Sequence, residues 1–287
     1  MKIGYLEERA LVSGLLTAAG MSEEDADIAS EVVAYSDFSG VYSHGLSRLT
    51  FYLKQLANGA MNAKAKCRRL DSGGAVSTFD CENGSGIVSV RKVYDELLPK
   101  VREYGIAAAT GRRSANIGCG AYYGQKAAQD GLIMLLCCNT YPLMAPYGGA
   151  DCIIGSNPII ISAPTARHAP VVLDISTCVA AMGKITAAKR EGRPIPEGWA
   201  KDAEGNPTTD PNRFHTVVPI AGHKGYGLAV MVDVMSAVLS GAAYGTNIGS
   251  LERLEPESTG FFMLLVDPSR FMPLDEFLGR MDDYIDM

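Results

Sequence analysis

A histidine and an arginine four residues apart are the side chains best placed for chemistry on a small organic acid. His44 lies between Ser43 and Gly45 at the start of a predicted helix, and Arg48 follows one turn later. Residues four apart share a helix face, and the amino end of a helix attracts anions. Arg48 could therefore bind a carboxylate through two parallel hydrogen bonds while His44 exchanges a proton with a neighbouring atom.

The same position would let His44 change its charge when a ligand binds. The positive end of the helix dipole favours the neutral imidazole in an empty site, whereas a bound anion raises its pKa again. A group of this kind can serve as both acid and base. The structural alternative is a helix cap at His44 and a solvated side chain at Arg48, and the spacing alone favours that alternative.

A glycine-rich segment, residues 118–124, follows the predicted strand 106–110 and opens a predicted helix. A Rossmann dinucleotide site requires the spacing GxGxxG and an acidic residue at the end of the next strand. In this segment the spacing is GxGxxxG, and the next predicted strand, 132–138, is followed by Asn139. We therefore expect no Rossmann site and attribute the glycines to close packing of a helix on a strand.

Two short segments place polar side chains where a strand ends or a helix begins, which is where α/β proteins bind ligands. Asp174 ends a predicted strand and could hydrogen-bond ribose hydroxyls, whereas Ser176 could simply cap a helix. Residues 222–225 open another predicted helix, where Lys224 could meet a phosphate or remain a surface charge. Both interpretations of each segment stay open at this point.

Composition limits the class of protein. The chain has 287 residues, of which 47% are hydrophobic and 20% charged, and its formal net charge is -6. These values are typical of a globular protein with a sizeable core. Nucleic acid is not an expected partner because binding phosphates requires clustered basic residues, although one arginine can still hold a small anion.

The cysteines and the apolar stretches indicate a cytoplasmic protein. The seven cysteines are odd in number and include no CxxC pair, which favours reduced thiols. No pair of histidines has the spacing of metal ligands, so no metal site is expected. Glu7 and Glu8 precede the first apolar stretch, where a signal peptide would be basic, and no apolar run is long enough to span a membrane.

The spacing of apolar residues predicts helices first, and then alternating strands and helices. The first seventy or so residues are expected to be helical, with a capping box at Ser22. Strand 106–110, helix 121–130 and strand 132–138 form a strand–helix–strand unit, which favours a parallel pair. We expect other strands at 75–80, 159–163, 171–174 and 261–266, other helices at 87–104, 180–190, 224–239 and from 274 onward, and a long loop over 191–219.

Six strings, in order along most of the chain, together resemble one family. The resemblance is to the malate/L-lactate dehydrogenases, a family that also holds ureidoglycolate dehydrogenase, sulfolactate dehydrogenase and diketogulonate reductase. The strings are Gly40-Val41-Tyr42-Ser43-His44-Gly45, Ala145-Pro146-Tyr147-Gly148-Gly149, Gly155-Ser156-Asn157-Pro158, Asp174-Ile175-Ser176-Thr177, Asn206-Pro207-Thr208-Thr209-Asp210-Pro211 and His223-Lys224-Gly225-Tyr226-Gly227.

The resemblance implies an α/β fold in which a non-Rossmann NAD(P)-binding domain is paired with a smaller helical domain. In this sequence we place the helical domain at residues 1–70, joined by 271–287, and the α/β domain at 71–270. The family works as a homodimer and transfers a hydride between NAD or NADP and a small carboxylate substrate, either a 2-keto acid or a cyclic imino acid. We therefore expect an NAD(P)-dependent oxidoreductase acting on a 2-hydroxy acid.

The resemblance also assigns roles to individual residues. The histidine of its Ser-His-Gly motif is the proton donor, which corresponds to His44, and the arginine that follows contacts the substrate carboxylate, which corresponds to Arg48. Ser43 and Thr140 are expected to bind substrate as well. The residues expected to bind the cofactor are Asp174, Ile175, Ser176, His223, Lys224 and Gly225.

This sequence departs from the family in two places. The family usually has a second histidine in the string Ser-x-His-x-Gly, where this chain has Asn116. Asparagine can hydrogen-bond a substrate oxygen but cannot transfer a proton at neutral pH, so we expect Asn116 to orient the substrate and His44 to carry the proton. Relatives also continue past the last helix with a segment that returns to the cofactor site, whereas this sequence stops at Met287, so a change in cofactor affinity is expected.

Two alternatives to a 2-hydroxy acid dehydrogenase follow from the same residues. One is a reductase of cyclic imino acids, in which the substrate supplies its own nitrogen. The other is a relative with weakened catalysis that still binds the cofactor, as the departure at Asn116 suggests. The sequence does not distinguish NAD from NADP, and it does not identify the acid.

Overall fold

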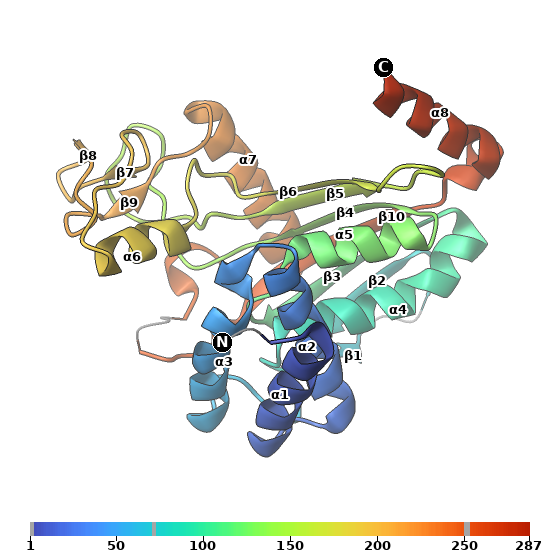
Figure 1. Cartoon of the computed structure of the whole chain (residues 1–287), viewed down its shortest axis with the longest axis horizontal. Helices are drawn as coiled ribbons and strands as arrows, with labels where there is room; N and C mark the ends of the chain where they lie inside the picture. Colours follow the sequence, from blue (N-terminus) through green and yellow to red (C-terminus); the bar gives the residue numbers. More distant parts are fainter. Residues whose placement is uncertain (1–2, 71–72, 250–252) are drawn as a thin grey trace.

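The computed structural model describes residues 3–70, 73–249 and 253–287, and its centre is a seven-stranded mixed sheet (Figure 1). The strands lie in the order β1-β2-β3-β10-β4-β5-β6. Their bounds are β1 Arg68–Arg69, β2 Val76–Asp80, β3 Ile106–Ser114, β4 Ile133–Cys138, β5 Ile159–Ala163, β6 Val171–Ile175 and β10 Thr259–Val266. The expected α/β architecture is confirmed.

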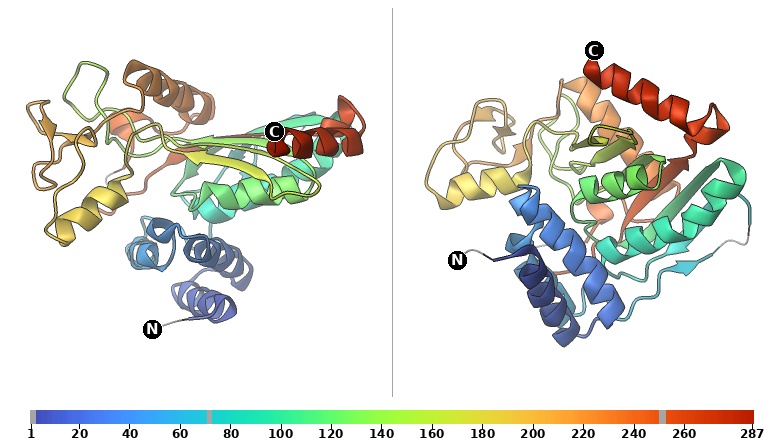
Figure 2. Two further views of the ribbon diagram at one scale, coloured as in Figure 1. Left: turned by 45° about the horizontal axis from the view of Figure 1, so that its top comes forward. Right: turned by 45° about the vertical axis from the view of Figure 1, so that its right-hand side comes forward.

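Two groups of helices lie on one side of this sheet. α4 and α5 lie on one face of it, and the amino-terminal helices α1 to α3 gather below that face (Figures 1 and 2). Their bounds are α1 Tyr5–Ala18, α2 Glu23–Phe38, α3 Leu46–Ala57, α4 Gly86–Tyr104, α5 Gly120–Gln129, α6 Met182–Arg190, α7 His223–Asp233 and α8 Leu274–Asp286, with 3-10 turns at Tyr42–His44, Gly245–Asn247 and Pro268–Arg270 and a π-helical continuation of α7 over Val234–Val238.

The predicted parallel pairing of strands 106–110 and 132–138 is wrong. β10 lies between β3 and β4 and is antiparallel to both, whereas β3 pairs in parallel with β2. β10 suits this central place because Phe261, Met263 and Leu265 are all fully buried. A strand from the far end of the chain therefore separates two strands that sequence proximity would have joined.

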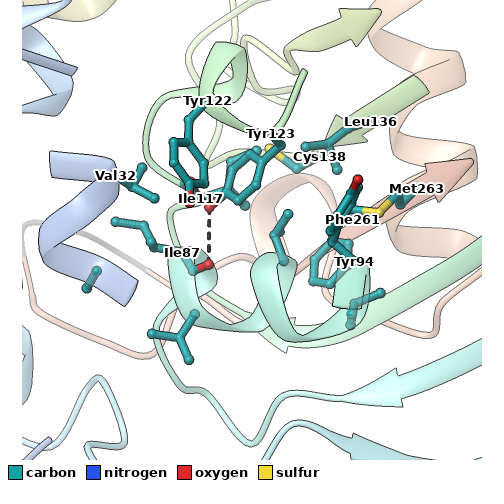
Figure 3. Close-up of a cluster of buried hydrophobic side chains, with 14 of the residues drawn as sticks. Val32, Ile87, Tyr94, Ile117, Tyr122, Tyr123, Leu136, Cys138, Phe261 and Met263 are labelled. Atoms are coloured by element: carbon teal, nitrogen blue, oxygen red, sulfur yellow. Dashed lines mark hydrogen bonds between the residues drawn. The ribbon is translucent and has the colours of Figure 1, made fainter. Parts of the chain in front are cut away.

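One apolar core joins the amino-terminal helices to the sheet. Val32 of α2, Ile87 of α4 and Tyr123 of α5 belong to the same buried cluster, as Figure 3 shows. The Tyr123 hydroxyl donates to the Ile87 carbonyl at 3.1 Å and to the Ile117 carbonyl at 2.9 Å, so its polar atom is satisfied inside the core. These contacts fix α2, and with it the chain that leads into α3, against the sheet.

The segment predicted as a long loop, residues 191–219, contains a small three-stranded sheet. Its strands are β7 Ala200–Lys201, β8 Pro207–Thr208 and β9 Thr216–Val217, in the order β8-β7-β9. Ile195, Ala200 and Val217 share a second apolar cluster with Ile185 of α6. This cluster lies at the other end of the molecule from α8 (Figure 2).

The carboxy-terminal helix lies apart from the amino-terminal helices, which differs from the expectation that residues 271–287 join residues 1–70. Figures 1 and 2 show α8 at the opposite edge of the molecule from α1 to α3. It is held there because Asp282 accepts hydrogen bonds from the Arg167 amide at 3.0 Å and Asp286 contacts His168 Nε2 at 2.8 Å. The division into 1–70 and 71–270 remains a proposal, and its boundary adjoins residues 71–72, outside the described part.

Candidate active site

The sequence-predicted substrate residues meet in one cavity between the amino-terminal helices and the sheet. This central cavity has a volume of about 440 Å³, which is in the range of small-molecule sites. Its walls come from the turn before α3, from α3 itself, and from the segments that follow β3, β4 and β6. The predicted residues that line it are Ser43, His44, Arg48, Asn116, Thr140, Asp174 and Ser176.

The start of α3 is fixed by a carboxylate from α2. Asp37 Oδ2 accepts a hydrogen bond from the Leu46 amide at 2.7 Å, which satisfies a free donor at the helix end. A Cβ at Gly45 would lie 2.0 Å from the Asp37 carboxylate, so only glycine allows this approach. The sequence had placed His44 at the start of this helix. In the structure, His44 instead ends the 3-10 turn that precedes α3.

His44 is a neutral base in the absence of ligand. Its Nδ1 is 3.0 Å from Ser43 Oγ, which leaves Nε2 as the ring nitrogen outside this hydrogen bond. Burial and, to a smaller extent, the charge of Arg48 together lower the pKa of His44 from 6.5 to about 4. The expected direction of this shift is found, but burial, not the helix dipole, is the main cause.

Arg48 has an unsatisfied donor that faces this region. Its Nε is buried and has no hydrogen-bond partner among the described residues. Its guanidinium carbon lies 4.7 Å from the centre of the Phe51 ring, which supports one face of the group. A buried guanidinium donor without a partner is costly, and a bound carboxylate would satisfy it.

Asn116 is held in a fixed orientation. Its Oδ1 accepts hydrogen bonds from the Tyr52 hydroxyl at 2.8 Å and from the Gly118 amide at 3.0 Å. With the acceptor engaged twice, the Nδ2 amino group is left to donate. The side chain that replaces the family's second histidine can therefore hold a substrate oxygen but supplies no titratable proton.

Four residues of the site escaped the sequence reasoning. Tyr52 and Gln55 follow Arg48 at helical spacing on α3, so the spacing could have revealed them. Tyr141 follows the same strand as Thr140. Glu257 has no motif, lines the central cavity and is only 6% exposed.

Thr140 lies in the cavity with its hydroxyl already in use. Thr140 Oγ1 accepts a hydrogen bond from the Ser156 amide at 3.0 Å, and its own amide donates to Asn157 Oδ1 at 3.0 Å. A Cβ at Gly155 would lie 2.3 Å from Thr140, so the two segments pack closely. Thr140 therefore helps to build the wall.

Asp174, which lines the same cavity, caps a helix. Its Oδ2 accepts a hydrogen bond from the Ala121 amide at 2.7 Å, at the amino end of α5. Loss of water around Asp174 raises its pKa, while the amides of Ala121 and Gly120 act in the opposite direction. Ser176 Oγ donates to the Cys178 carbonyl at 3.1 Å, and α6 begins later, so Ser176 is not its cap.

The glycines of residues 118–124 serve packing, as expected. A Cβ at Gly120 would lie 2.3 Å from Ile160, and one at Gly124 would lie 3.0 Å from Val172. Both contacts bring α5 close to β5 and β6. The helix start that carries Asp174 thus depends on these two small residues.

The remaining predicted cofactor residues do not line the central cavity. Ile175 ends β6 beside it, and Gly225 is buried in α7 against the Ile220 carbonyl, 2.2 Å from where a Cβ would be. His223 and Lys224 are exposed at the start of α7. The His223 ring meets the Tyr147 ring edge-on, with centroids 5.7 Å apart.

The cavities have room and chemistry for a nicotinamide dinucleotide. A wider outer cavity of about 1030 Å³ shares Ser43, Arg48 and Lys184 with the central one. Polar groups at Asp174 and Ser176 stand beside the apolar side chain of Ile160 in the central cavity, a mixture that suits an aromatic amide on a ribose. Within residues 3–70, 73–249 and 253–287, no group of three or more His, Cys, Asp or Glu could hold a metal ion.

Comparison with known proteins gives the class. The sequence profile described as malate/L-lactate dehydrogenase matches residues 3–287. Malate dehydrogenase of Pyrococcus horikoshii is 35% identical, over 99% of this chain and 84% of that protein. Ureidoglycolate dehydrogenase (NAD(+)) of Escherichia coli O157:H7 is 34% identical, over 88% of this chain and 72% of that protein. The solved sulfolactate dehydrogenase of Methanocaldococcus jannaschii superposes with a TM-score of 0.92 at 32% identity, covering 100% of this chain and 83% of that one.

The chain is thus an oxidoreductase of the hydroxy-acid dehydrogenase class. It belongs to the malate/L-lactate dehydrogenase family, and the resemblance drawn from its six strings is confirmed. Relatives depend on NAD(+) or on NADP(+), in agreement with the cofactors expected from the sequence. Among the described residues, no helix combines the length and apolar character needed to cross a membrane.

Proposed function

We propose that this protein interconverts a small 2-hydroxy acid, of the malate, lactate or ureidoglycolate type, and its 2-keto acid. One observation carries the proposal: a neutral histidine and an arginine whose Nε lacks a hydrogen-bond partner among the described residues line the same cavity as a fixed amide donor. His44 moves the proton, Arg48 binds the carboxylate, and Asn116 holds the oxygen on the reacting carbon. Family membership supports the reaction class, whereas the residue roles are our proposal.

In the direction of oxidation, His44 accepts the hydroxyl proton. The neutral imidazole has a free lone pair for this, because burial keeps it uncharged before substrate binds. A bound nicotinamide supplies the acceptor or donor for the hydride at the same carbon. In the direction of reduction, the substrate carboxylate on Arg48 offsets the positive charge beside His44, which favours protonated His44 and lets it deliver a proton to the forming alkoxide.

We further propose that Asp174, Ile175 and Ser176 hold the nicotinamide end of the cofactor. His223, Lys224 and Gly225 are proposed to meet its phosphates. Lys224 supports this assignment because it is an exposed cation in the first turn of α7, at the positive end of the helix dipole. The exposure of His223 and Lys224 leaves both accessible to a dinucleotide that extends from the central cavity.

We propose that the protein is a cytoplasmic homodimer. The described cysteines are free thiols, which agrees with a reducing compartment. An apolar face of α7 and its π-helical continuation is between 41% and 64% exposed, which favours a second copy as its cover. This face consists of Leu228, Met231, Val234, Val238 and Leu239. Sedimentation at twice the chain mass of 30.5 kDa tests the dimer, and a monomer at micromolar concentration contradicts it.

The test of the activity is the absorbance of reduced nicotinamide. Purified protein is mixed with NADH and NADPH in turn, against a panel of 2-keto acids and cyclic imino acids. Oxidation of the cofactor with a 2-keto acid is the expected result, and it identifies the substrate and the cofactor together. Turnover of a cyclic imino acid alone would replace the proposal with the imine reductase.

Folded protein that binds the cofactor by calorimetry but turns over no member of the panel would support the weakened relative instead. The Asn116→His variant then distinguishes the causes. Restored turnover would locate the defect at position 116.

A further inference from the structure

Glu257 is the carboxylate most deeply placed in the central cavity. Its side chain lies just before β10, is 6% exposed and lines the same space as His44, Arg48 and Asn116. Gln55 Nε2 donates to Glu257 Oε1 at 3.1 Å, and the Asn116 backbone amide also hydrogen-bonds its carboxylate. A carboxylate held in this way is a built part of the site.

Among the described residues, Arg48 is the cation whose charge acts on Glu257. Arg48 attracts the Glu257 carboxylate electrostatically, and it approaches from α3, as do Tyr52 and Gln55. Cys138 and Tyr141, at and after the end of β4, are the other titratable groups that Glu257 influences. Burial raises the pKa values of Tyr52, Cys138 and Tyr141, so all three stay protonated and uncharged near neutral pH.

We propose that Glu257 is the buried counter-charge of Arg48 and sets the affinity of the site for the substrate carboxylate. The inference rests on the proposed function, because it concerns the arginine that binds the substrate. Glu257 is a positioning residue: it acts through Arg48 and not on the reacting carbon. Asn116 is linked to Glu257 as well, because the backbone N–H of Asn116 hydrogen-bonds the Glu257 carboxylate.

Two anions, the Glu257 carboxylate and the substrate carboxylate, compete for one cation, Arg48. Ionised Glu257 offsets part of the charge of Arg48, so it weakens the binding of a substrate carboxylate. Burial raises the pKa of Glu257, while Gln55 and Arg48 act against this rise. Binding of an anion at Arg48 removes part of that opposition, and Glu257 takes up a proton. Affinity for the carboxylate should therefore fall as the pH rises through the titration of Glu257.

The test measures binding of oxamate, an analogue of a 2-keto acid with one carboxylate, by calorimetry with NADH or NADPH present. Glu257→Gln keeps the shape and the contact with Gln55 but removes the charge. We expect oxamate to bind about tenfold more tightly to this variant than to wild type at pH 9, and we expect this ratio to fall toward one as the pH is lowered through the titration of Glu257. Glu257→Asp retains the charge and should retain the pH dependence.

Asp267→Asn is the matched control. Asp267 is a similarly buried carboxylate, 5% exposed, whose ionic partner Arg102 lies 3.1 Å away and outside the central cavity. Its substitution should lower the melting temperature without changing oxamate affinity or its pH dependence. Asp174 and His44 also titrate in the cavity, but both are present in every variant, so the difference between wild type and Glu257→Gln isolates Glu257.

Three outcomes overturn the proposal. An unchanged pH dependence in Glu257→Gln, or weaker oxamate binding at pH 9, would reject the role of Glu257 while leaving the dehydrogenase activity intact. Failure of wild type to bind oxamate at all would reject the carboxylate site itself and, with it, the proposed function. If Glu257→Gln does not fold, proton uptake on oxamate binding is measured in two buffers for His44→Gln and for His44→Gln combined with Asp174→Asn. Uptake that persists in both is expected from Glu257, and its absence would reject the proposal.

Discussion

Two histidines stand beside glycines at two helix starts, and only one of them belongs to the central cavity. His44 lies in the turn before α3, where Asp37 from α2 caps the helix and burial shifts its pKa to about 4. His223 opens α7, is exposed, and contacts the Tyr147 ring. Similar local sequence therefore produces a buried base in one place and a surface group in the other, because neighbouring elements decide the burial.

The two helix starts also belong to different parts of the proposed site, one for the substrate and one for the cofactor phosphates. The substrate end consists of side chains already held by hydrogen bonds inside this chain, such as Asn116 and Tyr52. The proposed phosphate end, at Lys224, is exposed and has no such support among the described contacts. Substitutions at the first end should therefore damage chemistry, and those at the second should chiefly change cofactor affinity.

The largest expected effect comes from exchanging each histidine for glutamine. His44→Gln removes the group that accepts and donates the proton, so kcat should fall by about 10² to 10⁴. His223→Gln should leave kcat within about threefold, because loss of an exposed surface contact near the proposed phosphate site touches no reacting atom. Steady-state kinetics on the substrate identified by the panel measures both.

Melting curves of the two histidine variants serve as the control, since both should remain folded. A His44→Gln protein with full turnover would remove His44 from the mechanism. Equal losses of kcat in the two variants would instead mean that His44 is no more important for catalysis than His223.

The second expected effect concerns the glycine that lets Asp37 approach α3. Gly45→Ala places a Cβ 2.0 Å from the Asp37 carboxylate, so the cap must move and the turn that carries His44 must shift. We expect a loss of about 2 kcal/mol of stability and a fall in kcat. Chemical denaturation and kinetics measure the two quantities.

Gly227→Ala on α7 is the matched change for this test. Outside the backbone of its own helix no described atom lies within 4 Å of the position its Cβ would take, so kcat should be nearly unchanged and stability should not fall. Should Gly45→Ala prove as stable and active as wild type, the approach of Asp37 would not be what positions His44.

Local signals in the sequence predicted most of the longer helices and strands but not their arrangement. Ser22 caps α2 through the Asp25 amide at 3.1 Å, as the capping box predicted, because a cap involves residues only a few positions apart. The insertion of β10 between β3 and β4 involves residues more than a hundred positions apart, and periodicity carries no information about such pairings.

In the site, too, residues with a local sequence signal were predicted and those placed by distant contacts were not. His44 and Arg48 were predicted because four-residue spacing is a local property of a helix. Glu257 was not, since it reaches Gln55 across 202 positions and stands in no motif. Asn116 was identified only as a departure from the family, and its fixed orientation depends on Tyr52 from a different element.

The smallest expected effect is the dependence of stability on pH at the α3 cap. Burial and, to a smaller extent, the hydrogen bond and charge of Asp37 together raise the pKa of Glu8 from 4.5 to about 7. A pKa raised in the folded state stabilises the protein below pH 4.5, and this stabilisation is lost as the pH rises from 4.5 through 7. Glu8→Gln keeps a neutral partner beside Asp37 at every pH, so its stability should lack this decline.

Thermal melting between pH 4.5 and 8 measures the difference between wild type and Glu8→Gln. We expect the variant to gain about 1 kcal/mol relative to wild type across this range. His223 has no such carboxyl pair behind it among the described residues, so His223→Gln should melt in parallel with wild type. Parallel curves for Glu8→Gln and wild type would mean that Glu8 does not change the stability between pH 4.5 and 8, and that the two helix starts differ in burial alone.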